Sequence, residues 1–155
     1  MKIIETERLI FTHYDEDLYE DFIHLFTDEE VMKYVDKGVL SRDAADALWH
    51  RLTREFYPRG IKTIWAVLAR ENGRFIANAS IRPRPEKKDE TEIGYMLMQA
   101  EWGKGYATEI ARRLIELGFD ELHLGSRRNL NRQLGLDALA ASLAPNSTRE
   151  VGSHR

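Results

Sequence analysis

Two glycines between a predicted strand and a predicted helix are the residues of this chain best suited to bind a ligand. Residues 91–98 form a run rich in Ile, Tyr, Leu and Met, and residues 102–109 follow with the sequence Trp-Gly-Lys-Gly-Tyr-Ala-Thr-Glu. A helix that begins directly after glycines presents backbone N–H groups without partners and the positive end of its dipole. Since glycines also let an anion approach the main chain closely, this segment predicts a phosphate-binding site.

Other glycine-rich phosphate motifs match this segment poorly. A P-loop requires four residues between its first glycine and a Gly-Lys-Ser/Thr, whereas Tyr106 follows Gly105 here. A dinucleotide fingerprint requires a third glycine at the position of Thr108. For the loop taken alone, a glycine pair that serves only the geometry of a helix start is an equally good interpretation.

The residues around the loop resemble the Gcn5-related N-acetyltransferases (GNAT), whose acetyl-CoA loop has the pattern Arg/Gln-x-x-Gly-x-Gly/Ala. Trp102, Gly105 and Ala107 take the first, fourth and sixth positions, and Trp at the first position departs from the general pattern. Trp-Gly-x-Gly-Tyr-Ala, preceded by Glu-Ile-Gly-Tyr, is typical of the branch resembling ribosomal-protein alanine N-acetyltransferases. Residues 6–10 and 27–34 resemble further segments of that branch, so the resemblance covers about residues 3 to 124.

This resemblance implies that acetyl-CoA is the cosubstrate and that no metal is needed. The pantetheine arm would pair with the main chain at the end of the strand, and the pyrophosphate would meet the N–H groups of the loop and the helix start. The residues that would contact the cofactor are Leu97, Met98, Gln99, Trp102, Gly103, Lys104, Gly105, Tyr106, Ala107 and Thr108. For Lys104, a solvated position on the surface is at least as good an interpretation.

The implied reaction is direct attack of a primary amine on the thioester within a ternary complex. The amine arrives as an ammonium and must lose a proton, and Glu92 is the candidate base because the branch often has Glu before Ile-Gly-Tyr. An equal alternative is that Glu92 points outward from its strand and pairs with Lys or Arg. By position alone, Trp49, Phe56 and Tyr57 could line the site for the acceptor amine.

After Leu124 the chain departs from the family pattern. The family continues with further strands and with a tyrosine that protonates the leaving thiolate, but no tyrosine follows Tyr106 in this chain. We expect a core over 1–124 that lacks the usual last two strands, and an atypical segment over 125–155 with a helix at 130–144 and a flexible tail at 145–155. A truncation or a reading-frame change would explain the shift. A predicted strand at 119–124 would keep an open edge, which predicts a homodimer.

Composition limits the classes of function. A chain of 155 residues with 43% hydrophobic and 32% charged residues predicts one globular domain rather than a disordered protein. No apolar run approaches the ~20 residues of a membrane span, and the N-terminus is not a signal peptide. The absence of cysteine removes thiol nucleophiles and cysteine-bound zinc and suits a cytoplasmic protein. A net charge of −3 gives no general attraction to nucleic acid, and the five histidines show no metal-ligand spacing.

The elements that would position the loop follow from hydrophobic periodicity. It predicts a strand at 8–13, a helix at 15–26, and two strands at 63–69 and 74–82 joined by the turn signal Asn72-Gly73. Two further helices are predicted, the first opened by a capping box from Thr27 to Glu30 and the second capped by Ser41. Together the elements predict an α+β fold with a mostly antiparallel sheet flanked by helices, as in the GNAT family.

Two functions remain open from the sequence. The first is an active N-acetyltransferase that acts on a protein N-terminus or a small-molecule amine. The second is an acyl-CoA-binding module, or a degenerate enzyme that keeps the cofactor site without turnover.

Overall fold

The computed structural model describes residues 3–33, 35, 38–83, 91–118 and 148–151. Its strands are β1 (Ile4–Glu5), β2 (Leu9–Thr12), β3 (Ile64–Ala69), β4 (Phe75–Pro83), β5 (Thr91–Leu97) and β6 (Thr148–Val151). Its helices are α1 (Tyr19–Phe26), α2 (Glu29–Met32), α3 (Arg42–Arg51) and α4 (Tyr106–Glu116). Three shorter turns of helix complete the described elements: η1 (Glu16–Leu18) and η3 (Gln99–Glu101), which are 3₁₀, and η2 (Leu52–Phe56), which is a π-helical turn.

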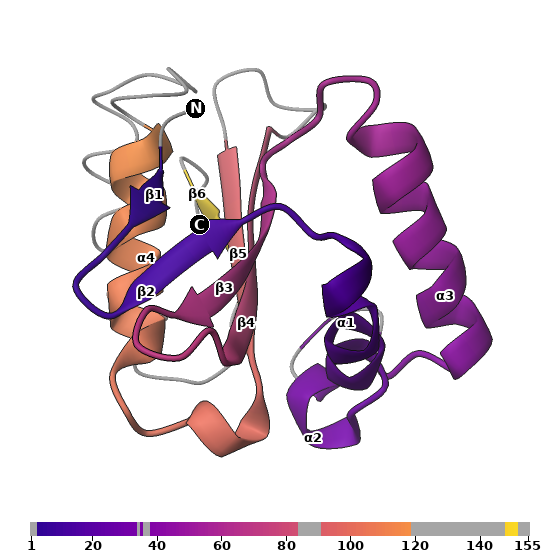
Figure 1. Cartoon of the computed structure of the whole chain (residues 1–155), viewed down its shortest axis with the longest axis horizontal. Coiled ribbons are helices and arrows are strands. Elements are labelled where there is room, and N and C mark those ends of the chain that lie inside the picture. The colour runs from indigo at the N-terminus through magenta and orange to yellow at the C-terminus, as the bar shows by residue number, and fades with distance from the viewer. Residues whose placement is uncertain (1–2, 34, 36–37, 84–90, 119–147, 152–155) are drawn as a thin grey trace.

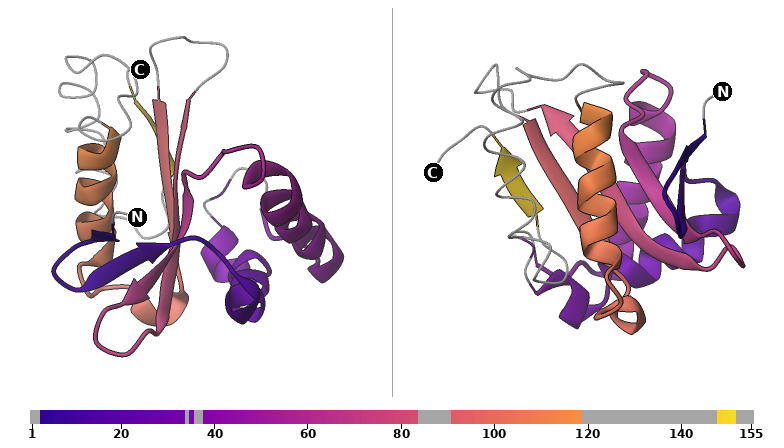
Figure 2. Two further views of the ribbon diagram at one scale, coloured as in Figure 1. Left: turned by 45° about the horizontal axis from the view of Figure 1, so that its top comes forward. Right: turned by 90° about the vertical axis from the view of Figure 1, so that its left-hand side faces the viewer.

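The described strands form one sheet in the order β1-β2-β3-β4-β5-β6, with every neighbouring pair antiparallel. Helix α4 covers one face of this sheet, and helices α1 to α3 lie on the other (Figures 1 and 2). The predicted α+β fold with an antiparallel sheet between helices is therefore confirmed.

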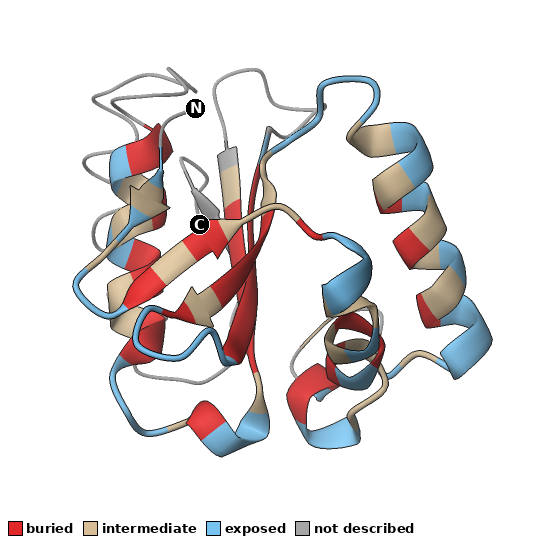
Figure 3. Cartoon of the chain, viewed as in Figure 1, coloured by how far each residue is buried: buried red, intermediate tan, exposed pale blue. Residues whose placement is uncertain are grey.

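The sheet separates two hydrophobic clusters because successive side chains of a strand point to opposite faces. On β5, the side chains of Ile93, Tyr95 and Leu97 pack with Ile110 and Leu114 of α4 in the first cluster. The second cluster lies between the sheet and helices α1 to α3 and contains Phe22, Ile23, Leu25, Trp49, Ala66, Phe75 and Met96. Figure 3 shows that buried residues follow the central strands and the inner sides of the helices. The sheet thus holds β5 between two packed layers.

Of the two helix caps predicted from the sequence, one is confirmed and the other is wrong. Ser41 caps α3 as predicted, since its side chain accepts a hydrogen bond from the N–H of Ala44. The capping box at Thr27 is wrong: Asp28 caps α2 by accepting from the N–H groups of Glu30 and Val31. The Thr27 hydroxyl donates instead to the carbonyl of Ile23, because Thr27 ends α1 and its side chain folds back onto the preceding turn.

Part of the predicted C-terminal segment can be compared with the structure. The strand predicted at 119–124 and the helix predicted at 130–144 lie outside the described residues. Residues 148–151, assigned to a flexible tail from the sequence, instead form β6, which runs antiparallel to β5 from the pair Thr91↔Val151 to the pair Gly94↔Thr148. The edge of β5 offers main-chain donors and acceptors with which this segment pairs.

No helix in the described ranges could cross a membrane, since each is too short or too polar.

Candidate functional site

The loop between β5 and α4 contains two glycines in an unusual backbone conformation. Gly103 and Gly105 adopt left-handed conformations, with φ of 78° and 86°, and Gly105 is the N-cap residue of α4 without a capping side chain. The carbonyl of Gly105 accepts from the N–H of Glu109, at 3.2 Å. Within the described residues, no hydrogen bond outside the helices and strands uses an N–H group of residues 103–108. These groups therefore form an uncapped helix start of the kind that binds anions.

The main chain just before the loop is used within the fold. The N–H of Met98 donates to the carbonyl of Ile76 on β4, at 2.9 Å, and the carbonyl of Met98 accepts from the N–H of Glu101, at 2.9 Å. The carbonyl of Gln99 accepts from the N–H of Trp102, at 3.2 Å. Both main-chain groups of Met98 therefore have partners within the fold, and its pairing with a cofactor stays a prediction.

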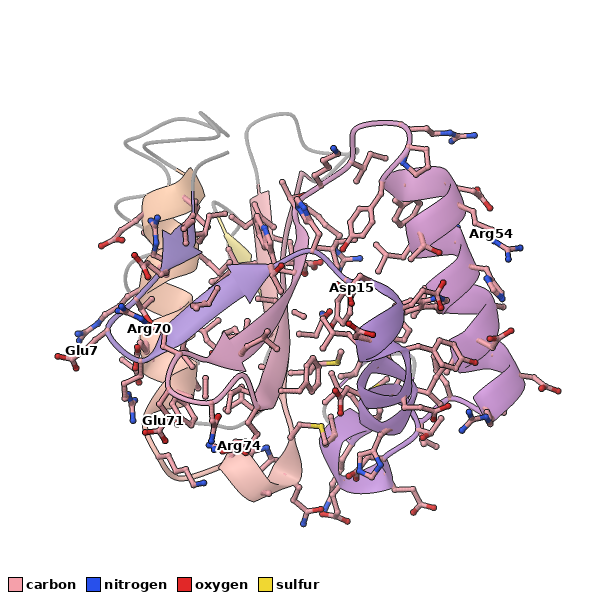
Figure 4. The ribbon with its side chains drawn as sticks, in the orientation of Figure 1. Glu7, Asp15, Arg54, Arg70, Glu71 and Arg74 are labelled. Atoms are coloured by element: carbon pink, nitrogen blue, oxygen red, sulfur yellow. The ribbon has the colours of Figure 1, made fainter. Side chains whose placement is uncertain are left out.

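A buried carboxylate holds the loop against the sheet. The Glu101 side chain is only 5% exposed and accepts from Arg74, with Nε–Oε2 and Nη2–Oε1 distances of 2.8 and 3.1 Å. Lys104 Nζ lies 3.1 Å from Glu101 Oε1, so this lysine forms an ion pair within the protein. The hydrogen bond from Arg74, aided by that from Lys104, lowers the pKa of Glu101 despite its burial. Figure 4 places Arg74 beside the turn that leads to α4.

A second group of charged residues joins the loop to the turn between β1 and β2. Arg8 Nε donates to Glu109 Oε1 at 2.7 Å, and the N–H of Arg8 donates to Glu109 Oε2 at 2.9 Å. Thr6 Oγ1 also donates to Glu109 Oε2. Burial would raise the pKa of Glu109, but the hydrogen bonds from Thr6 and Arg8 outweigh it and lower the pKa. Glu109 is therefore a carboxylate held by three donors in the first turn of α4.

The sequence analysis did not find Arg8, Arg74, Glu101 or Glu109. An acidic residue in the first turn of a helix is a recognisable signal, and Glu109 has that position. The partners of Glu101 and Glu109 come from distant strands, and no local pattern indicates such pairs.

An open cavity of about 450 Å³ lies beside the loop, between α4 and the β1–β2 turn. It is lined by Glu5, Thr6, Glu7, Gly105, Thr108, Glu109, Arg112, Arg113 and Glu116. Two residues predicted to contact the cofactor, Gly105 and Thr108, thus reach a solvent-accessible surface. Among the described side chains, no group of three or more His, Cys, Asp or Glu could hold a metal ion.

Glu92, the candidate base, lies near the other end of β5. It pairs with Arg82 on β4, and the distance from Arg82 Nη2 to Glu92 Oε1 is 2.5 Å. Its side chain is 23% exposed and alternates with Ile93, so it faces the layer of α1 to α3. The structure shows the ion pair that the sequence left open as an alternative. Tyr95 is buried on the opposite face, in the core beneath α4.

The aromatic residues considered for the acceptor site belong mainly to the core. Trp49 is 3% exposed and makes edge contacts with Tyr14 and Phe22. The Tyr57 hydroxyl donates to the carbonyl of Ile64, at 2.8 Å, and accepts from the N–H of Tyr14, at 3.1 Å. Burial raises the pKa of Tyr57 to about 12, so this phenol stays neutral and structural. Trp49 and Tyr57 therefore stabilise the packing of η2 and α3 onto the sheet.

Proteins with similar sequences include two from Bacillus. YkkB, an uncharacterized protein of Bacillus subtilis, is 32% identical over 103 residues, which are 65% of this chain. The chain spans only 58% of the length of YkkB. An uncharacterized N-acetyltransferase of Bacillus licheniformis, p20, is 24% identical over 151 residues, which cover 97% of this chain and 78% of p20.

Comparison with solved structures supports the fold. The acetyltransferase from Agrobacterium tumefaciens strain C58 superimposes with a TM-score of 0.67 at 20% identity, covering all of this chain and 95% of that one. The family profile described as Acetyltransferase (GNAT) domain matches residues 8–149, and this range includes β5, the glycine loop and α4. On this match, which spans most of its length, the chain belongs to the GNAT acetyltransferase family.

Proposed function

We propose that this protein is an N-acetyltransferase that moves the acetyl group of acetyl-CoA to a primary amine. The single observation that carries the proposal is the uncapped start of α4, where two left-handed glycines precede N–H groups without capping partners. Such a site suits a diphosphate, because the N–H groups and the helix dipole both favour negative charge. Membership of the GNAT family supports an acyl-CoA as the molecule that supplies it.

The cofactor would lie along β5. Its pyrophosphate would accept from the N–H groups of residues 103–107 and from the hydroxyl of Thr108. Its pantetheine arm would extend past Leu97 toward Glu92 across the face of β5 that Glu92 points to, because β4 and β6 occupy both edges of the strand from Thr91 to Gly94. Leu97 and Glu92 are five residues apart on β5, or roughly 17 Å at the usual rise of a strand. An extended pantetheine arm is of the same order of length, so the thioester could reach the neighbourhood of Glu92.

The reaction would proceed by direct attack in a ternary complex. Glu92 would exchange Arg82 for the substrate ammonium and accept its proton, directly or through water. The amine nitrogen would then form a bond to the thioester carbonyl carbon, and the carbon–sulfur bond would break. The leaving thiolate would take a proton from water or, given the acidity of the thiol, would depart as the anion.

The acceptor is a primary amine on a protein N-terminus or a small molecule. A second candidate function is an acyl-CoA-binding module without turnover. This alternative is favoured by the ion pair between Arg82 and Glu92, because the candidate base already has a partner in the protein.

A paired experiment tests the proposal. Acetyl-CoA would be titrated calorimetrically into the protein, with acetyl-pantetheine, which lacks the diphosphate, as the control ligand. Release of free thiol would then be measured over a panel of peptides with free N-termini, polyamines, amino acids and amino sugars. Binding of acetyl-CoA with amine-dependent thiol release is the expected result. Binding without release on any amine would favour the binding module, and no binding would overturn both functions.

A further inference from the structure

Arg8 lies outside the loop and contacts it at several points. Its Nη1 donates to the carbonyl of Lys104 at 3.0 Å, and its guanidinium carbon lies 4.4 Å from the centre of the Tyr106 ring. A Cβ atom placed on Gly105 would lie 3.4 Å from Arg8 Nη2, so this guanidinium is in close contact with the N-cap residue of α4. With its two bonds to Glu109, Arg8 contacts the loop and the first turn of α4 together.

These contacts address two requirements of a diphosphate site. First, the N–H groups of the loop must keep a fixed orientation, and the Arg8–Lys104 bond fixes the peptide plane just before Gly105. Second, a carboxylate in the first turn of α4 would repel an anion that binds there. Arg8 Nε lies 2.7 Å from Glu109 Oε1, and the positive guanidinium offsets the negative charge of this carboxylate. The start of α4 therefore remains attractive to a phosphate.

We infer that Arg8 is a positioning residue for the diphosphate of the cofactor, acting through the main chain of the loop and the charge of Glu109. The inference rests on the proposed function, because it assigns a role in binding the same cosubstrate. It makes the turn between β1 and β2 a part of the cofactor site, although that turn lies about a hundred residues before the loop in the sequence.

Arg70 provides a matched control. Its Nη1 donates to the carbonyls of Thr6 and Glu7, at 3.0 and 3.3 Å, and it pairs with Glu5 at 3.6 Å. It therefore holds the same β1–β2 turn, but none of its described contacts reaches the loop or α4. Figure 4 shows Arg70 and Glu7 together at this corner of the molecule. Arg70→Gln loosens the turn but removes none of the contacts that Arg8 makes with Lys104, Tyr106 and Glu109.

The experiment compares Arg8→Gln and Arg70→Gln with the unmodified protein. The dissociation constants of acetyl-CoA and acetyl-pantetheine would be measured by calorimetry, and kcat and KM for acetyl-CoA would be measured with any amine that supports thiol release. We expect Arg8→Gln to weaken acetyl-CoA binding about tenfold, as for the loss of a charge-assisted hydrogen bond. Its kcat and its affinity for acetyl-pantetheine should stay within twofold of the unmodified values, and Arg70→Gln should change neither affinity.

Equal losses in Arg8→Gln and Arg70→Gln would overturn the inference, because both variants would then report only the stability of the turn. An equal loss for acetyl-CoA and acetyl-pantetheine would also overturn it. If Arg8→Gln does not fold, Arg8→Lys replaces it under the same criteria. A lysine keeps the positive charge but cannot donate to the carbonyl of Lys104 and the carboxylate of Glu109 at the same time. Failure of the unmodified protein to bind acetyl-CoA would instead contradict the proposed function.

Discussion

The indole Nε1 of Trp102 donates a hydrogen bond to the carbonyl oxygen of Leu97, at 3.2 Å. The bond links the residue that follows η3 to the last residue of β5. Trp102 directly precedes Gly103, the first glycine of the loop. The Trp102 ring also packs against the hydrophobic clusters on both faces of the sheet. The residue at the first position of the loop pattern thus determines where the loop leaves the strand.

Replacing Trp102 with Phe should separate this hydrogen bond from the packing of the ring. Phe keeps an aromatic side chain but has no donor for the Leu97 carbonyl. We expect a loss of about 1 kcal/mol in the free energy of unfolding, together with weaker binding of acetyl-CoA because the loop is less fixed. Urea denaturation and calorimetric titration would measure the two effects. Unchanged affinity in the variant would show that the bond does not shape the cofactor site.

Replacing Gly105 with Ala should impair binding more than folding. Gly105 has a φ of 86°, and a left-handed conformation costs a residue with a Cβ about 1 kcal/mol. The added Cβ would also contact Arg8 Nη2 at 3.4 Å and press on the group that orients the loop. Gly73→Ala is the matched control, because Gly73 has a φ of 76° and open space around its Cβ position. Both variants should lose similar stability, but only Gly105→Ala should lose affinity for acetyl-CoA.

Much of the site could be predicted because it is local in the sequence. The strand at 91–97, the glycines at 103 and 105 and the helix start at 106 lie within 16 residues of one another, and their geometry follows from rules for neighbouring residues. The alternation along β5 also indicates which side chains face α4. Local rules were less reliable where two residues compete for one role. Asp28 rather than Thr27 caps α2, and the choice depends on where α1 ends.

The charged network around the loop could not be predicted from the sequence. Arg8 and Glu109 are 101 positions apart, and Arg74 and Glu101 are 27 apart. Such pairs depend on which strands become neighbours and on how α4 crosses the sheet, and hydrophobic periodicity carries neither piece of information. The engaged main chain of Met98 was missed for a related reason, because it depends on how far the pairing of β4 with β5 continues past Leu97.

The Arg74–Glu101 pair predicts a specific dependence of stability on pH. Arg74, aided by Lys104, lowers the pKa of folded Glu101 below its ordinary value of 4.5. The unfolded chain therefore binds this proton more readily, and stability falls as the pH drops below 4.5 and through the folded-state pKa. Glu101→Gln should be less stable than the unmodified protein at pH 7, and the difference should shrink in acid. Urea denaturation of both proteins between pH 7 and pH 3 would measure it, and parallel curves would contradict the assignment.

Glu92→Gln should separate the two functions that the site allows. If Glu92 is the base, the variant should lose about a hundredfold or more in kcat, since a positioned base contributes at least that factor. Its affinity for acetyl-CoA should stay unchanged, because Glu92 lies at the far end of β5 from the loop.

Glu20→Gln is the control for this test, because Glu20 pairs with Arg42 at 3.0 Å on the exposed surface and lies outside the proposed site. Arg82→Gln completes the comparison, since it removes the guanidinium that lies 2.5 Å from the Glu92 carboxylate. Activity retained in Arg82→Gln and lost in Glu92→Gln would show that the Glu92 carboxylate itself is needed. Equal and small losses of activity in both variants would contradict a role as base and show that the ion pair only stabilises the sheet. The decisive readout is thiol release at saturating acetyl-CoA, where changes in cofactor affinity no longer contribute to the rate.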